Sequence, residues 1–227
     1  MKKILLIIIL AVFLFNDSAT AIPTFGTLMP ESGEYQGGAR SDFIFKRDVK
    51  DYDGAKTTAY YYKASYGLAE WFCLDGLVGL GDVRAERIFE KELRYPFNFS
   101  GGYGWRAKVY KNEKYGVDWV FGFQHVSTHP GMQWHESRKH EIIWDDWQIS
   151  TVMSKRIWKI IPYCGMKWSF TYLISKINYN RNRRISTSPP IGLVVGTDFR
   201  INNYIYLNVE SRFFDETALN AGFTIRY

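Results

Sequence analysis

Cysteine and long apolar runs are both scarce in this chain of 227 residues. Its only cysteines are Cys73 and Cys164, too few for the disulfide framework of a small secreted domain, although one bridge between them stays open. After residue 15 there is no stretch of about 18 consecutive apolar residues, the length a membrane-spanning helix needs. A disulfide scaffold and a helical membrane protein are therefore both excluded.

The N-terminus has the pattern of a secretory signal peptide. Two lysines precede an apolar run from Ile4 to Phe15, and Ala19-Thr20-Ala21 offers the small residues that signal peptidase cleaves after. The apolar run is too short for a helix across a hydrocarbon core of ~30 Å. We expect residues 1–21 to be removed as a signal and residues 22–32 to form an N-terminal periplasmic segment.

Aromatic residues are abundant, with 16 Tyr, 16 Phe and 8 Trp. A water-soluble secreted domain rarely carries so much aromatic surface. The formal net charge of +6 could indicate nucleic acid, but an exported chain seldom meets it. Anionic outer-membrane lipids and lipopolysaccharide are the partners we expect instead, with no nucleic acid and no cofactor.

The C-terminal sequence alternates between apolar and polar residues. In TALNAGFTIRY, Leu219, Phe223 and Tyr227 fall on one face of a strand, while Asn220 and Arg226 fall on the other. This resembles the last strand of Gram-negative outer-membrane β-barrels, which ends on an aromatic residue. The resemblance implies that the barrel assembly machinery recognises the strand ending at Tyr227, and that the protein is integral to the outer membrane.

The same alternation recurs along most of the chain. In lipid every backbone polar group must be satisfied internally, which only a closed sheet achieves with strands. We therefore predict an all-β fold, an antiparallel transmembrane β-barrel over 33–227 with about ten strands, or eight if weak strands merge. The predicted strands are 33–47, 56–68, 73–83, 98–110, 115–127, 140–153, 159–175, 190–200, 203–213 and 217–227.

Charged residues fall on the face predicted to point inward. A barrel of eight to ten strands is narrow enough for side chains to fill it, so a general porin is not expected. A soluble β-sandwich or a lipocalin-like barrel would also alternate, but it would place charges outside. The predicted inward charges are Lys63, Arg106, Lys108, Asp198, Arg200, Glu210, Arg212 and Arg226.

The segment VFGFQHVST, 120–128, turns polar at its end. Phe121, Phe123, His125 and Ser127 share the predicted outward face, near the outer-leaflet rim where lipid esters lie. A histidine beside a serine can act as its general base, with a third polar group to orient the ring. If the following hairpin is symmetric about 127–140, Glu141 lies opposite His125, with Glu136 and Asp145 as further choices.

This His-x-Ser element resembles that of two families of lipid-hydrolysing outer-membrane barrels, the lipid A 3-O-deacylases and outer-membrane phospholipase A. The resemblance implies hydrolysis of acyl esters, with Ser127 as nucleophile, His125 as general base and Glu141 as the acid. Those families usually have Asn after the serine, whereas this chain has Thr128. The resemblance therefore does not imply how this chain would stabilise the oxyanion of the reaction.

Other interpretations of the same residues stay open. His125 and Ser127 could simply mark the end of the hydrophobic band in a non-enzymatic barrel that serves envelope integrity or surface binding; a narrow transporter is the third alternative. All four histidines, His125, His129, His135 and His140, fall in one hairpin and could bind zinc or copper. In the loop NRNRR, the guanidinium groups of Arg181, Arg183 and Arg184 could bind lipopolysaccharide phosphates.

Overall fold

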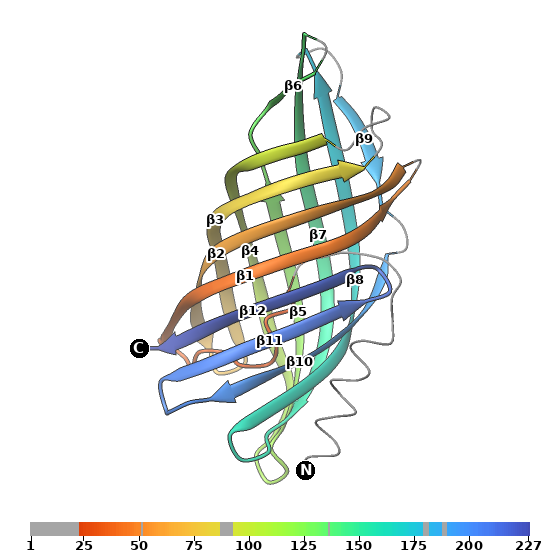
Figure 1. Cartoon of the computed structure of the whole chain (residues 1–227). Coiled ribbons are helices and arrows are strands. Elements are labelled where there is room, and N and C mark those ends of the chain that lie inside the picture. The colour runs from red at the N-terminus through yellow and green to blue at the C-terminus, as the bar shows by residue number, and fades with distance from the viewer. Residues whose placement is uncertain (1–22, 51, 87–92, 136, 179–181, 188–189) are drawn as a thin grey trace.

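The chain forms a closed β-barrel, which confirms the predicted fold class (Figure 1). The computed structural model describes residues 23–50, 52–86, 93–135, 137–178, 182–187 and 190–227. The signal predicted at 1–21 therefore lies outside the described residues. Among those that are described, no helix is long and apolar enough to span a membrane.

Ten strands make the barrel, as predicted, and each pairs antiparallel with its neighbours. The order around the wall is β7-β5-β4-β3-β2-β1-β12-β11-β10-β8, and pairing of β7 with β8 closes it. The strands are β1 (Tyr35–Val49), β2 (Tyr52–Ala69), β3 (Phe72–Glu86), β4 (Leu93–Asn112), β5 (Val117–Thr128), β7 (Arg138–Lys155), β8 (Ile160–Ile177), β10 (Ile191–Arg200), β11 (Ile205–Phe213) and β12 (Thr217–Arg226).

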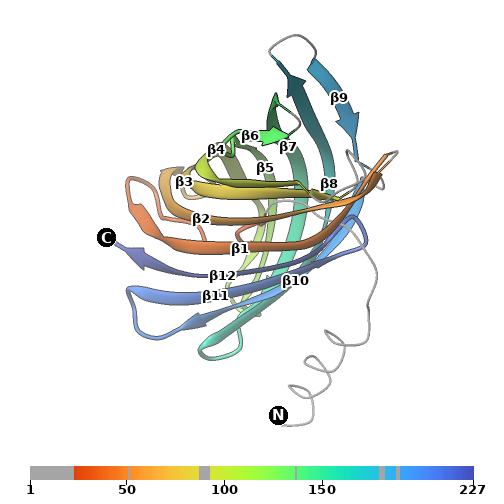
Figure 2. The same cartoon turned by 45° about the horizontal axis from the view of Figure 1, so that its top comes forward.

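The two ends of the barrel differ. The short-turn end carries the C-terminus and the turns at 70–71, 113–116, 156–159 and 201–204. At the opposite, long-loop end, β7 and β8 rise above the other strands and pair with two short strands, β6 (Gln133–His135) and β9 (Asn182–Ser186) (Figures 1 and 2). The sequence had predicted loops where β6 and β9 form. Alternation of long and short connections is what an outer-membrane barrel shows.

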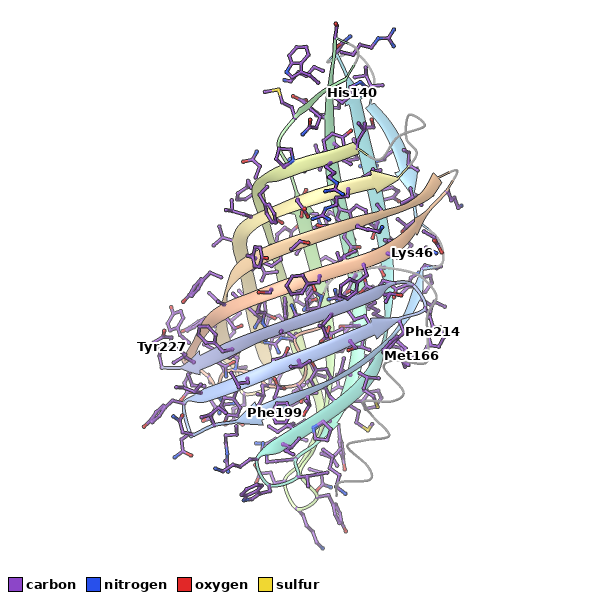
Figure 3. All side chains as sticks on the ribbon, in the orientation of Figure 1. Lys46, His140, Met166, Phe199, Phe214 and Tyr227 are labelled. Atoms are coloured by element: carbon purple, nitrogen blue, oxygen red, sulfur yellow. The ribbon has the colours of Figure 1, made fainter. Side chains whose placement is uncertain are left out.

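The outer wall of the barrel is apolar, as the period-two pattern predicted. Phe199, Phe214 and Tyr227 project from the wall in Figure 3, and exposed large apolar side chains recur on every long strand. An exposed surface of this size would be unfavourable in water, because each buried apolar Å² is worth about 25 cal/mol. Contact with hydrocarbon would account for the pattern, which is the one that outer-membrane barrels show.

Charged side chains fill the lumen. Arg106 donates two hydrogen bonds to Asp75, at 2.7 and 2.9 Å, and Lys63 lies 3.0 Å from the same carboxylate. On the opposite wall Arg212 donates to Asp42 at 2.7 Å. All of these side chains are buried, which confirms the inward orientation predicted for Lys63, Arg106 and Arg212.

Residues 23–32, here called the N-terminal segment, enter the lumen. Thr24 donates through its backbone N–H and its hydroxyl to Glu210, at 2.9 and 2.8 Å. Phe25 lies between the cations of Arg40 and Lys63, and Arg106 donates to its carbonyl oxygen. The sequence predicted a periplasmic segment at 22–32, separate from the barrel. In the structure residues 23–32 pack inside the barrel and occupy the lumen.

The two cysteines are free and lie on different faces of the wall. Cys73 on β3 is buried, whereas Cys164 on β8 is exposed. The disulfide that the sequence left open is therefore not formed.

Candidate active site

The predicted catalytic residues lie on β5 where it approaches the long-loop end. His125 is paired with Tyr103 of β4 on one side and with Trp147 of β7 on the other. Ser127 is paired with Gly101 and Asp145. Side chains of alternate residues share a face, so His125 and Ser127 both belong to the outer wall and are partly exposed. The predicted orientation of this pair is confirmed.

Ser127 contacts a histidine, but not the one that the sequence assigned to it. Its hydroxyl oxygen lies 3.0 Å from Nε2 of His129. The backbone N–H of His129 donates to the carbonyl oxygen of Phe99 at 2.8 Å, which continues the pairing with β4 past the end of β5. Because Pro130 follows, His129 favours an extended conformation, and its side chain stays on the same face as that of Ser127.

An aromatic ring lies beside this histidine. The centroid of the Phe99 ring lies 6.3 Å from that of His129. Phe99 also leans over Gly101, where an added Cβ would lie 2.8 Å from the edge of the ring. A larger residue at 101 would displace Phe99, so the glycine opposite Ser127 contributes to the position of His129.

His125 makes a separate set of contacts. Its Nδ1 lies 3.0 Å from the carbonyl oxygen of Asp146, and its Nε2 lies 3.7 Å from Oδ1 of Asp145. The imidazole stacks on Trp147, with 3.9 Å between ring centroids. Since both ring nitrogens face oxygens on β7, His125 is not oriented to accept the Ser127 proton.

The predicted position of Glu141 opposite His125 is wrong. Glu141 is paired with Lys176 of β8, and its carboxylate lies 2.5 Å from Lys139. It is six residues along β7 from Trp147, the residue that is opposite His125, which corresponds to about 20 Å of strand.

The error has a structural cause. The predicted hairpin was symmetric about 127–140, but β6 continues the pairing, with Gln133 opposite His140 and His135 opposite Arg138. The pairing therefore extends to His135 and Arg138, so the hairpin turns further along the chain than assumed. Asp145, the third choice, is the carboxylate that the register brings beside His125 and Ser127, while Glu136 lies outside the described residues.

The four histidines do not assemble into a metal site. His140 is buried on the inner face of β7, whereas His125 and His129 are on the outer wall. Figure 3 shows His140 near the top of the barrel. The side chain of His135 lies outside what the structure describes, and only its backbone pairing with Arg138 is placed. Within the described ranges, no three His, Cys, Asp or Glu side chains are close enough to hold a metal ion.

The arginines of the NRNRR loop are only partly described. Arg181 lies outside the described residues. Arg183, in β9, is placed only through its backbone pairing with Ser175 of β8. The guanidinium of Arg184 is exposed and lies 4.8 Å from the centre of the Tyr172 ring. Binding of lipopolysaccharide phosphates by these residues stays a prediction.

No family model matches this chain, and no curated protein is similar to it in sequence. Among solved structures, an outer membrane channel from Pseudomonas putida F1 has a TM-score of 0.49 and 9% identity, covering 92% of this chain and 100% of that one. The attachment invasion locus protein Ail of Yersinia pestis, in complex with the heparin analogue sucrose octasulfate, has a TM-score of 0.46 and 10% identity, covering 88% and 100%. The outer membrane protease OmpT of Escherichia coli has a TM-score of 0.44 and 10% identity, covering 88% and 99%.

Proposed function

We propose that the protein is an outer-membrane enzyme that hydrolyses acyl esters of outer-leaflet lipids at Ser127. The observation that carries this proposal is the 3.0 Å contact between the Ser127 hydroxyl and Nε2 of His129. A nucleophile and its base must lie within about 2.6–3.2 Å for proton transfer. The base is thus His129 rather than His125.

The location of the pair favours a lipid substrate. Both side chains are on the outer wall, next to Phe99 and Tyr103, which are more than half exposed at 51% and 56%. With the short turns facing the periplasm, as in outer-membrane barrels, the long-loop end reaches the outer leaflet. Acyl chains would lie along the aromatic rings, and the ester group would lie at the level of Ser127.

The chemistry follows from the pair. Ser127 Oγ attacks the ester carbonyl carbon while its proton moves to Nε2 of His129. The C–O bond then breaks, and the alcohol leaves with that proton. Water attacks the acyl-serine ester in the second half of the reaction, again with His129 as base, and a fatty acid is released.

His125 and Asp145 have a different role in this proposal. Trp147 donates to the Asp145 carboxylate at 3.2 Å, and the same carboxylate lies beside His125. They form a polar group on the outer wall next to the nucleophile, where lipid headgroups offer hydroxyl and phosphate partners. Among the described residues, no carboxylate contacts His129, so the arrangement is a Ser-His pair rather than a triad.

Release of fatty acid by refolded protein in detergent tests the proposal. Phospholipid and lipid A are supplied separately to wild type, Ser127→Ala, His129→Gln and Ser211→Ala. Ser211 is a matched control, because it also lies on the outer wall, on β11 between Val195 and Leu219. We expect release by wild type and Ser211→Ala only. No release by wild type, or equal release by Ser127→Ala, would leave a non-enzymatic barrel as the better explanation.

A further inference from the structure

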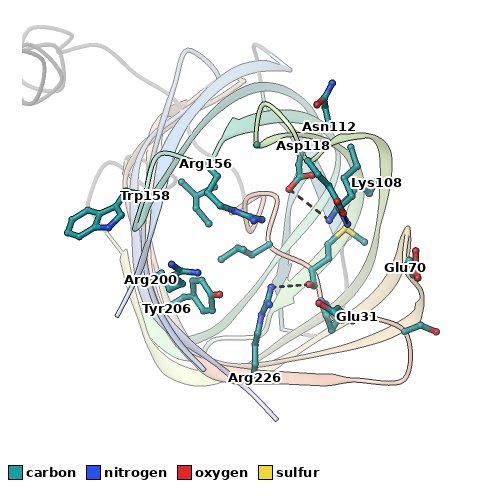
Figure 4. Close-up of a pocket in the computed structure, with 18 residues that line it drawn as sticks. Glu31, Glu70, Lys108, Asn112, Asp118, Arg156, Trp158, Arg200, Tyr206 and Arg226 are labelled. Carbon is teal, nitrogen blue, oxygen red and sulfur yellow. Dashed lines mark hydrogen bonds and ion pairs between the residues drawn. The ribbon is translucent and has the colours of Figure 1, made fainter. Parts of the chain in front are cut away.

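The short-turn end of the barrel contains a polar cavity of about 700 Å³. It is enclosed by Leu28 to Ser32 of the N-terminal segment, by the turns that follow β4 and β7, and by the inner faces of β10, β11 and β12 (Figure 4). Sites for small organic ligands typically occupy about 300–1,000 Å³, so this space is large enough for one. It lies at the opposite end of the barrel from Ser127.

Three arginines reach into this cavity from three different elements. Arg156 comes from the turn after β7, Arg200 from the end of β10 and Arg226 from the end of β12 (Figure 4). None of the three guanidinium groups has a carboxylate within 4.0 Å among the described residues. Like charges around one cavity repel each other, so the arrangement favours an anion between them.

Two of the acidic residues that line the cavity are already paired. Glu113 lies 2.8 Å from Lys111, and Asp118 lies 4.0 Å from Lys108. The other two, Glu31 and Glu70, are both exposed, one on the N-terminal segment and one in the turn after β2. The two lysines and their acids offset each other, and Glu113 also interacts with Arg156, so Arg200 and Arg226 are the cations most available to a ligand.

Arg226 is held in a fixed position for such contact. Its guanidinium lies 5.1 Å from the centre of the Tyr206 ring, and one Nη donates to the carbonyl oxygen of Met29 at 3.4 Å. Its Nε is buried and has no hydrogen-bond partner in the protein. A buried donor without a partner is unfavourable, and an oxygen atom from a ligand would relieve this.

We propose that this cavity binds a small polyanion that carries two or more phosphate or carboxylate groups. Guanidinium groups bind both oxyanions in a bidentate manner, and three of them arranged around a cavity of this size can engage separate anionic groups of one molecule. In an outer-membrane orientation the cavity opens to the periplasm. The binding itself does not depend on the hydrolase proposed for the outer wall.

Titration calorimetry of the refolded full chain in detergent tests this site. Inorganic tripolyphosphate and citrate serve as separate probes, which distinguishes phosphate from carboxylate ligands. We expect saturable binding of at least one probe by wild type. Affinity should fall about tenfold or more in Arg200→Gln and in Arg156→Gln, since each loses charge-assisted hydrogen bonds.

The matched control is Arg138→Gln, which removes the same charge from the long-loop end of β7. This variant should bind like wild type. Circular dichroism and the shift between folded and heated bands on gels identify any variant that fails to fold, and Arg156, in an exposed turn, is the substitution least able to disturb the barrel. No saturable heat with either probe, unchanged affinity in both cavity variants, or an equal loss in Arg138→Gln would overturn the proposal.

Discussion

The imidazole of His125 stacks on the indole of Trp147, with its Nδ1 against the carbonyl oxygen of Asp146. This places His125 among the contacts of β7, while His129 is the imidazole that contacts Ser127. We expect His129→Gln to lower the rate of fatty acid release by about 10²–10⁴-fold, the usual contribution of a general base.

In contrast, His125→Gln should change that rate by less than tenfold. Initial rates on one lipid substrate at saturating concentration measure both effects. Glu141→Gln serves as the control for a distant carboxylate, since Glu141 pairs with Lys139 and faces β8. A loss in His125→Gln as large as that in His129→Gln would contradict the assignment of the base.

The buried Arg106 connects the wall to the N-terminal segment. It donates to Asp75 and to the carbonyl oxygens of Phe25 and Leu28. Arg106→Ala would leave a buried carboxylate with only Lys63 and Ser65, and two carbonyl groups without their donor. We expect the free energy of unfolding to fall by about 3–5 kcal/mol.

Denaturant unfolding in detergent micelles measures that loss, and hydrogen exchange of residues 23–32 reports whether the segment leaves the lumen. Lys108→Ala is the control, because Lys108 is less buried and lies 4.0 Å from Asp118. A stability equal to that of wild type together with unchanged exchange would mean that Arg106 does not anchor the segment.

Val78 tests whether the outer wall meets hydrocarbon. It lies near the middle of β3 and is 55% exposed. Val78→Arg should make folding into bilayers less favourable by about 2–4 kcal/mol, the cost of a charged residue near the membrane midplane. Trp71→Arg, at the short-turn end, should cost only about 0–1 kcal/mol. Equal effects at the two positions would argue against a transmembrane orientation.

The C-terminal aromatic residue tests recognition by the assembly machinery. Tyr227 follows β12 on the outer wall and is 72% exposed. Tyr227→Ala should reduce the amount of heat-modifiable barrel in the outer-membrane fraction of expressing cells several-fold. Tyr204→Ala is the control, since Tyr204 is an exposed aromatic residue of the neighbouring turn. A normal yield of assembled Tyr227→Ala would exclude this role.

The candidate site was only partly predictable from sequence. His125 and Ser127 were placed correctly on the outer wall, because orientation on a strand depends on residue parity. His129 was considered as a metal ligand, although its spacing of two from Ser127 already placed both side chains on one face. The carboxylate partner was misassigned because the length of a hairpin loop does not reveal where its tip lies.

Sequence by itself determined the fold class, the number of strands and the direction in which most side chains point. These properties are local, since alternation with a period of two follows from backbone geometry and each strand shows it independently. Only the tertiary structure decided the register of β5 against β7, the entry of the N-terminal segment into the lumen and the convergence of three arginines at the short-turn end. Each of these brings together residues far apart in the chain, and their contacts depend on barrel closure and loop conformation rather than on any local pattern.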